Sequence, residues 1–285
     1  MTTRSDQTSE AHRTVTTQPP HVLTILAHPD DESFGLAGTF ATLTDRGFGV
    51  TLVCATRGEV GEILVEGLAT RETLGELREA ELRTAMAHVG VRDIRLLGFR
   101  DSGMAGTEEN ADPRAFVNAD HDAVVETLVG IISELKPAAV TTFGPDGVYG
   151  HPDHIRAHEV ALAAVLRAAE LGVWEVPVLY YAAASRQRVQ EFAKYPGSPF
   201  SSMTPDVLAT FGTPDEDIST RLDISAQVDR KWAAIKAHRS QVGDGDLFPG
   251  LPREVIEQFT RYESLRIVPL PWNPEPRDVL EELTA

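Results

Sequence analysis

Short apolar runs alternate along the chain with longer segments that carry an apolar face at helical spacing. The runs expected to form strands lie at residues 22–27, 50–55, 94–97, 138–143 and 178–181. The helical patterns lie between them, at 35–46, 71–89, 119–135 and 153–171. Gly90, Pro137 and Pro152 stand where these helices end or begin. The alternation predicts an α/β fold with a Rossmann-like, doubly wound and mostly parallel sheet that has helices on both faces.

Beyond Gly172 the pattern is weaker. A helix over 225–241, capped by Ser225, and a last strand over 261–268 are predicted there. The segment 185–220 carries no motif that indicates a role.

One domain is expected over residues 21–285, with a core at 21–180 and a smaller C-terminal subregion at 181–285. Residues 1–20 are rich in Thr, Ser and Gln and are predicted to be a disordered leader. They lack the apolar segment of a signal peptide. No apolar run in the chain approaches the roughly 18 residues needed to span a bilayer, so no membrane span is expected.

Composition narrows the function classes. With 26 basic and 43 acidic side chains the net charge is −17, and nucleic acid is not expected as a partner because phosphate binding needs concentrated Lys and Arg. The single cysteine, Cys54, cannot form an internal disulfide or a multi-cysteine zinc site, so a metal must be held by His and carboxylate groups. It also favours a reducing compartment, and a cytoplasmic location is expected. The sequence holds no signal for the oligomeric state.

Two turns that each follow a predicted strand carry the same tripeptide, His-Pro-Asp. The first turn is His28-Pro29-Asp30-Asp31-Glu32, and the second is Tyr149-Gly150-His151-Pro152-Asp153-His154. Neighbouring parallel strands bring such turns together at the carboxyl edge of a sheet, where ligands bind. Helix capping by Asp30 or Asp31 would explain the first turn alone. It does not explain the recurrence.

Two histidines and a carboxylate with an open fourth position form the ligand set of a hydrolytic zinc site. We expect His28, Asp31 and His154 to bind the metal, which leaves Asp30 and His151 free for proton transfer. The spacing is equally compatible with Asp30 as the carboxylate ligand. Zinc, iron(II) and cobalt(II) all suit this donor set.

Other enzyme classes lack their motifs. His158 lies four residues after His154, but position 162 is Leu, so the metalloprotease motif fails and a packing role is expected for His158. No G-x-G-x-x-G follows the first strand and no G-x-S-x-G is present, which argues against a dinucleotide cofactor and a serine nucleophile. Cys54 lies in an apolar strand and is expected to be a small buried hydrophobe.

With these motifs the chain resembles the LmbE-like family of zinc N-deacetylases, which includes the N-acetylglucosaminyl-phosphatidylinositol deacetylases, and most closely its mycothiol-pathway members. The resemblance covers residues 21–243. Besides Arg78, the matching segments are 27–33, 58–59, 81–82, 100–107, 149–154 and 237–241.

The resemblance implies roles for both turns. It places zinc on His28, Asp31 and His154, and it makes Asp30 the general base. His151 becomes the general acid and a partner of the oxyanion.

Further residues enter through the resemblance alone. Asp153 is implied to orient His151, and the Tyr149 hydroxyl to reach the oxyanion. Arg78 and Asp101 are implied to bind sugar hydroxyls. The alternatives are a solvated salt bridge for Arg78, which has acidic neighbours on a predicted helix, and turn formation for Asp101.

The implied activity is removal of an N-acetyl group from a small N-acetylglucosamine-containing substrate such as N-acetylglucosaminyl-inositol. One alternative is an amidase that acts on mycothiol-type S-conjugates or another N-acyl compound. A metal-binding protein without catalysis is the other, and the intact Asp30, Tyr149 and His151 argue against it. His238 and Gln241 are expected to lie on a helix that packs against the site without a catalytic role.

Overall fold

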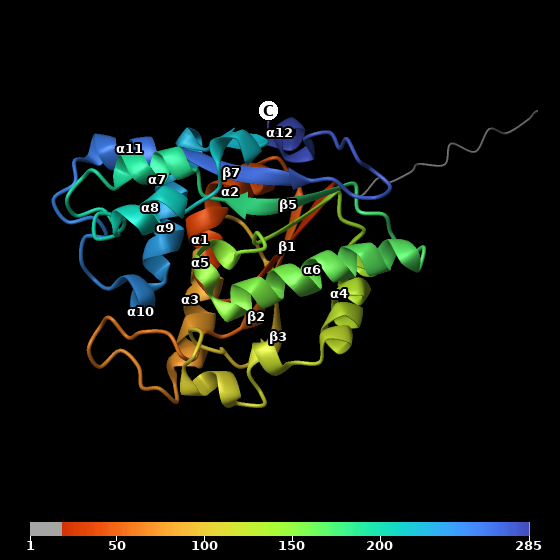
Figure 1. Ribbon diagram of the computed structural model, residues 1–285, viewed down its shortest axis with the longest axis horizontal. Coiled ribbons are helices and arrows are strands. Elements are labelled where there is room, and N and C mark those ends of the chain that lie inside the picture. The colour runs from red at the N-terminus through yellow and green to blue at the C-terminus, as the bar shows by residue number, and fades with distance from the viewer. Residues whose placement is uncertain (1–18, 285) are drawn as a thin grey trace, which may run out of the picture.

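A computed structural model describes residues 19–284 (Figure 1). Most of the predicted leader, residues 1–20, lies outside the described residues. Within them, no helix is both long enough and apolar enough to cross a membrane.

The centre of the fold is a seven-stranded sheet with the strand order β3-β2-β1-β4-β5-β7-β6. Its strands are β1 (His21–Leu26), β2 (Gly49–Thr56), β3 (Asp93–Phe99), β4 (Ala139–Thr142), β5 (Val178–Ala183), β6 (Thr220–Asp223) and β7 (Tyr262–Val268). The first five pair in parallel, whereas β7 is antiparallel to both β5 and β6. The predicted α/β class with a mostly parallel sheet is confirmed.

Helices cover both faces of this sheet (Figure 1). The α-helices are α1 (Asp31–Gly35), α2 (Ala37–Asp45), α3 (Leu74–His88), α4 (His121–Leu135), α5 (Gly147–Gly150), α6 (Pro152–Glu170), α7 (Arg186–Phe192), α8 (Pro205–Thr210), α9 (Val228–Ala237), α10 (Arg239–Val242), α11 (Arg253–Thr260) and α12 (Val279–Thr284). Helices α4 and α6 pack together against β1, and α9 packs against α2 and α3. From β1 the chain moves along the sheet to β2 and β3, and from β4 it moves in the opposite direction to β5. Because such crossovers are right-handed, the two groups of helices lie on opposite faces of the sheet.

Strand β1 lies between β2 and β4, where the strand order reverses. Its residues after His21 are all buried, as expected for a strand that is covered on both faces. In open α/β sheets, a crevice for ligands forms beyond the carboxyl ends of the two strands at such a reversal. Both His-Pro-Asp turns lie at this point, one after β1 and the other in the connection from β4 to α6.

Some predicted elements differ from the structure. The helix predicted over 35–46 is divided at Leu36 into α1 and α2. The helix predicted over 225–241 begins with a 3₁₀ turn, Ser225–Gln227, and is interrupted at His238. Ser225 makes no capping hydrogen bond, so that part of the prediction is wrong. Strand β6 and helices α7, α8, α11 and α12 were not predicted. The division into a core and a C-terminal subregion stays a prediction.

Candidate active site

The first His-Pro-Asp turn is closed by its own acidic side chain. Asp31 Oδ2 accepts the backbone N–H of His28 at 2.7 Å. Asp30 has a φ of 121°, a conformation that costs a non-glycine residue on the order of 1–3 kcal/mol and persists where the surroundings hold it. Its side chain makes no capping bond to α1, so the capping interpretation fails for Asp30.

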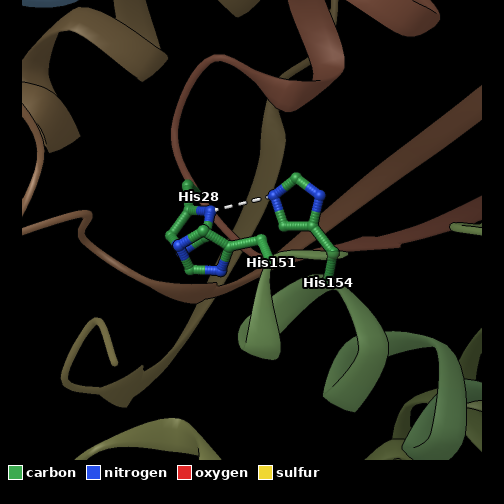
Figure 2. Close-up of side chains that lie close together, drawn as sticks. All are labelled: His28, His151 and His154. Atoms are coloured by element: carbon green, nitrogen blue, oxygen red, sulfur yellow. Dashed lines mark hydrogen bonds between the residues drawn. The ribbon is translucent and has the colours of Figure 1, made fainter. Parts of the chain in front are cut away.

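Three predicted ligand groups meet at this edge of the sheet. His28 Nδ1 lies 3.2 Å from His154 Nε2 (Figure 2), and His154 Nε2 lies 3.2 Å from Asp31 Oδ1. His28 Nδ1 lies 3.6 Å from Asp31 Oδ2. Ligand atoms at zinc-binding distance from one tetrahedral ion are separated by roughly 3.3 Å. The three separations therefore suit one metal ion held between these atoms.

The outer nitrogen of each histidine is already hydrogen-bonded. His154 Nδ1 lies 3.2 Å from the carbonyl oxygen of Gly147, which only accepts, so Nδ1 carries the hydrogen. His28 Nε2 lies 3.1 Å from Asp153 Oδ2, a carboxylate oxygen that also accepts. When both rings are neutral, their inner nitrogens carry lone pairs that face each other and the Asp31 carboxylate. This arrangement favours a cation between the rings.

The charges around His28 also favour a cation. Burial lowers the pKa of His28, but the carboxylates of Asp101 and Asp153 outweigh it and hold this pKa well above its ordinary value. Burial raises the pKa of Asp31, but His154 and His28 outweigh it and hold this pKa well below its usual range. Asp31 is therefore ionised and available as a ligand at neutral pH.

His151 lies beside the two histidines that are predicted as ligands, with its ring centroid 4.5 Å from that of His28 and 5.1 Å from that of His154 (Figure 2). The three rings form a buried group whose ligand atoms lie within 4.8 Å of one another. His151 Nδ1 accepts the backbone N–H of Asp153 and so caps α6. Burial and the neighbouring His28 lower the pKa of His151 to about 4. The ring is neutral at pH 7, and its Nε2 carries the hydrogen.

The carboxylate of Asp153 orients His28. It is completely buried and accepts the Ser102 N–H at 2.9 Å, the Ser102 hydroxyl, and His28 Nε2 at 3.1 Å. The contact of Asp153 with His151 runs through its backbone N–H. The role of Ser102 was not predicted from the sequence, because no local pattern indicates its contact with Asp153, which lies 51 residues away in the chain.

Arg78 is buried, with 3% of its surface exposed, and its hydrogen bonds go to protein groups. Nη1 donates to the Gly58 carbonyl at 2.8 Å, and Nη2 donates to the Pro29 carbonyl and to Asp30 Oδ2 at 3.0 Å. This burial excludes the solvated salt bridge considered for Arg78. Burial raises the pKa of Asp30 to about 6, and Arg78 opposes that rise. Asp30 is thus a carboxylate whose pKa lies near the range suited to a general base.

Asp101 is also buried and bound by protein groups. Its carboxylate accepts the backbone N–H of Gly103 at 2.8 Å and of Val60 at 3.2 Å, and it lies 3.5 Å from His28 Nε2. The turn interpretation of Asp101 matches these bonds. Contact of Arg78 or Asp101 with a sugar stays a prediction.

Tyr149 stands over the site with 53% of its surface exposed, and its ring meets that of His154 edge-on at 5.0 Å. Its loop is strained at Val148, a β-branched residue with a φ of 69°. Burial of the hydroxyl end and the nearby carboxylates raise the pKa of Tyr149, so the hydroxyl stays protonated and able to donate.

Phe143 and His158 support the His154 ring. Phe143 stacks on His154 with ring centroids 4.0 Å apart, and the Phe143 carbonyl lies 3.0 Å from His158 Nδ1. His158 also contacts the Tyr181 ring, so its predicted packing role is confirmed. Cys54 is buried within β2, as predicted.

Comparison with known proteins identifies the family. The family described as GlcNAc-PI de-N-acetylase matches residues 23–165. A 1D-myo-inositol 2-acetamido-2-deoxy-alpha-D-glucopyranoside deacetylase from Geodermatophilus obscurus is 41% identical over 268 residues, which cover 87% of this chain and 91% of the relative. The chain belongs to the GlcNAc-PI de-N-acetylase family. A protein of the same name from Saccharomonospora viridis is 42% identical to this family member over 237 residues, which cover 79% of this chain and 86% of the relative.

Solved structures share the fold of this de-N-acetylase family member at lower identity. An N,N'-diacetylchitobiose deacetylase from Pyrococcus horikoshii matches with a TM-score of 0.58 and 22% identity, covering 87% of this chain and 84% of that chain. A 4-carboxy-2-hydroxymuconate hydratase from Pseudomonas putida matches with a TM-score of 0.57 and 19% identity, covering 87% and 96%. Because one fold serves both a deacetylase and a hydratase, the fold alone does not determine the reaction.

These comparisons confirm three predictions made from the motifs of this de-N-acetylase family member. They are the LmbE-like family, the fold class, and the enzyme class, a deacetylase that hydrolyses N-acetyl amide bonds.

Proposed function

We propose that the chain is a zinc-dependent N-deacetylase that acts on N-acetylglucosaminyl-inositol or a closely related amino-sugar. One observation carries the metal dependence: the inner nitrogens of His28 and His154 face each other and Asp31, while both outer nitrogens are bound to acceptors. The names of the two deacetylases that are about 40% identical support the substrate class.

His28, Asp31 and His154 would hold the metal. When bound, zinc polarises the amide carbonyl as a Lewis acid and lowers the pKa of a bound water from 15.7 toward about 7. The distances and the outer hydrogen bonds of the two histidines support this ligand set over one with Asp30, since Asp30 is bound to Arg78. Iron(II) and cobalt(II) suit the same donors.

Asp30 is the proposed general base. Its side chain keeps 22% of its surface exposed and lies next in sequence to ligand Asp31, and its carboxyl group has a pKa of about 6. At neutral pH it is mostly ionised and takes a proton from the attacking water. Its bond to Arg78 holds the carboxylate in place.

His151 and Tyr149 are the proposed donors to the carbonyl oxygen, which becomes negative during attack. Neutral His151 offers its Nε2–H and Tyr149 offers its hydroxyl, and one such donor contributes roughly 2.7–4 kcal/mol to transition-state stabilisation. The departing amine needs a proton, and His151 is the proposed donor. Because the resting pKa of His151 is about 4, the ring gains this proton from solvent only after negative charge has developed beside it, and it is neutral again once the amine has taken the proton. Asp30 releases the proton that it took from the attacking water to solvent when the products leave.

Arg78 and Asp101 are proposed to support the catalytic groups, with any contact to sugar hydroxyls secondary to that role. Arg78 binds Asp30, and Asp101 lies beside His28. A cytoplasmic location remains a prediction from the single cysteine.

The direct test measures the products of the zinc-loaded protein. We expect acetate and free amine in equal amounts from N-acetylglucosaminyl-inositol, with a loss of at least about 100-fold in Asp30→Ala. Asp122→Ala, which removes an exposed carboxylate from α4, is the matched control and keeps wild-type activity. Zinc-independent or absent acetate release would overturn the proposal, and faster cleavage of a mycothiol-type S-conjugate would establish the amidase alternative.

A further inference from the structure

His238 reaches from the junction of α9 and α10 to the first His-Pro-Asp turn. It is completely buried, and its Nε2 lies 2.7 Å from Oε1 of Glu32, which is also buried. His238 Nδ1 has no hydrogen-bond partner among the described residues, so the contacts of Nε2 with Glu32 and Ser33 orient the ring. The C-terminal part of the chain is thereby joined to the turn that carries Asp30 and Asp31.

The second oxygen of Glu32 holds the backbone of Asp30. Glu32 Oε2 accepts the Asp30 N–H at 2.9 Å, and Oε1 accepts the Ser33 hydroxyl at 2.5 Å as well as the bond from His238. Asp30 is the residue whose φ of 121° needs support from its surroundings. Glu32 supplies this support at the backbone, and His238 fixes Glu32.

We propose that His238 and Glu32 are positioning residues that hold the Asp30 carboxylate where it acts as the base. The inference rests on the proposed function of Asp30. Arg78 fixes the side chain of Asp30, and the first turn of α1 binds its carbonyl oxygen through the N–H groups of Ser33 and Phe34. The His238–Glu32 pair fixes the backbone N–H of Asp30. Misplacement of a reacting group by about 1 Å costs about 100-fold in rate, which makes this attachment of the Asp30 N–H important for catalysis.

The same segment provides a matched control. Ser240, on α10, donates its N–H at 2.7 Å and its hydroxyl at 2.6 Å to the Glu81 carboxylate of α3, and both residues are buried. Ser240→Ala removes a buried hydrogen bond next to His238 without touching Glu32 or Asp30. A general loosening of α10 would therefore affect both variants alike.

The test compares His238→Leu, His238→Gln, His238→Asn and Ser240→Ala in the zinc-loaded full chain. We expect His238→Leu to lower kcat by about 10- to 100-fold, with KM and zinc content unchanged. Gln offers an N–H donor near the position of Nε2 and should restore most of kcat, whereas Asn is too short to reach Glu32 and should behave like Leu. Ser240→Ala should lower Tm and leave kcat unchanged.

Hydrogen–deuterium exchange of the Asp30 amide gives a readout that does not depend on turnover. It should be faster in His238→Leu and His238→Asn than in the wild type or Ser240→Ala. If His238→Leu does not fold, the difference between Gln and Asn carries the test. Any of three results would overturn the positioning role. They are an equal kcat for His238→Gln and His238→Asn, a loss of kcat in His238→Leu no larger than in Ser240→Ala, and an unchanged exchange rate at the Asp30 amide. A wild type without zinc-dependent hydrolysis would instead overturn the proposed function.

Discussion

Replacement of Arg78 by Met is expected to change the pH dependence of catalysis. Arg78 donates to Asp30 Oδ2 at 3.0 Å from a buried position, and its charge opposes the burial that raises the pKa of Asp30 to about 6. Met fills a similar volume without a charge, so the pKa of Asp30 rises further. Since the base acts when ionised, activity is present above its pKa and is lost as the pH falls through it. The variant therefore loses activity at a higher pH than the wild type.

The size of the expected pKa shift of Asp30 follows from its contact with Arg78. Two unit charges about 4 Å apart at an effective dielectric constant of about 20 interact by about 4 kcal/mol, or about three pKa units. The Asp30 side chain keeps 22% of its surface exposed, and solvent screening brings the expected rise in its pKa to about one to three units. At pH 7 the ionised fraction of Asp30 then falls roughly 2- to 100-fold.

The assay is kcat/KM of the zinc-loaded protein between about pH 5 and 10 for the wild type, Arg78→Met and Arg78→Lys. In Arg78→Met the acid limb of the kcat/KM–pH profile should shift to higher pH, and activity should recover at high pH. Arg78→Lys keeps the charge, so its acid limb should shift less. If the acid limb of Arg78→Met stays at the wild-type pH while KM rises and kcat is unchanged, this reasoning is refuted and Arg78 acts in substrate binding alone.

Three further predictions concern the surroundings of the site. Asp153→Asn weakens the bond that orients His28 and should reduce zinc affinity by about 10- to 100-fold in a competition titration, whereas wild-type affinity would contradict that role. Gly58→Ala places a Cβ 2.2 Å from Arg78 Nη1 at a φ of 64°, so Tm and kcat should both fall, and wild-type values of both would argue against the packing described here. In the metal-free protein, the raised pKa of His28 contributes stability that is complete below its unfolded value of about 6.5 and is lost as the pH rises through the higher folded value. The lowered pKa of Asp31 contributes stability that is present above its unfolded value of about 3.9 and is lost as the pH falls through the folded value. Tm of the metal-free protein should therefore be highest between about pH 4 and 6.5. A Tm that keeps rising above this range would contradict the assignment for His28, and a Tm that does not fall below it would contradict the assignment for Asp31.

The central strands could be predicted because burial on both faces demands continuous apolar runs, as in 22–27. Strand β6 could not, since its sequence Thr-Arg-Leu-Asp alternates between buried and exposed positions and is too short to give a pattern. The interruption at His238 accompanies a contact with Glu32, 206 residues away, and local helical periodicity holds no information about such a contact.

The two histidine turns could be predicted because their residues are adjacent in sequence and each turn follows a strand. The groups that support them could not. Ser102 and Glu32 act through hydrogen bonds whose geometry is set by the fold. Arg78 and Asp101 were linked to sugar by motif alone, and their burial against protein groups appears only in three dimensions.

The most direct test of the metal-dependent deacetylase is a reconstitution titration that follows acetate release from N-acetylglucosaminyl-inositol as zinc is added to the metal-free protein. Activity should be absent at the start, rise in proportion to added zinc, and level off at one equivalent per chain, while His154→Ala stays inactive throughout. Full activity in the metal-free protein, or the same titration curve for His154→Ala, would contradict the account.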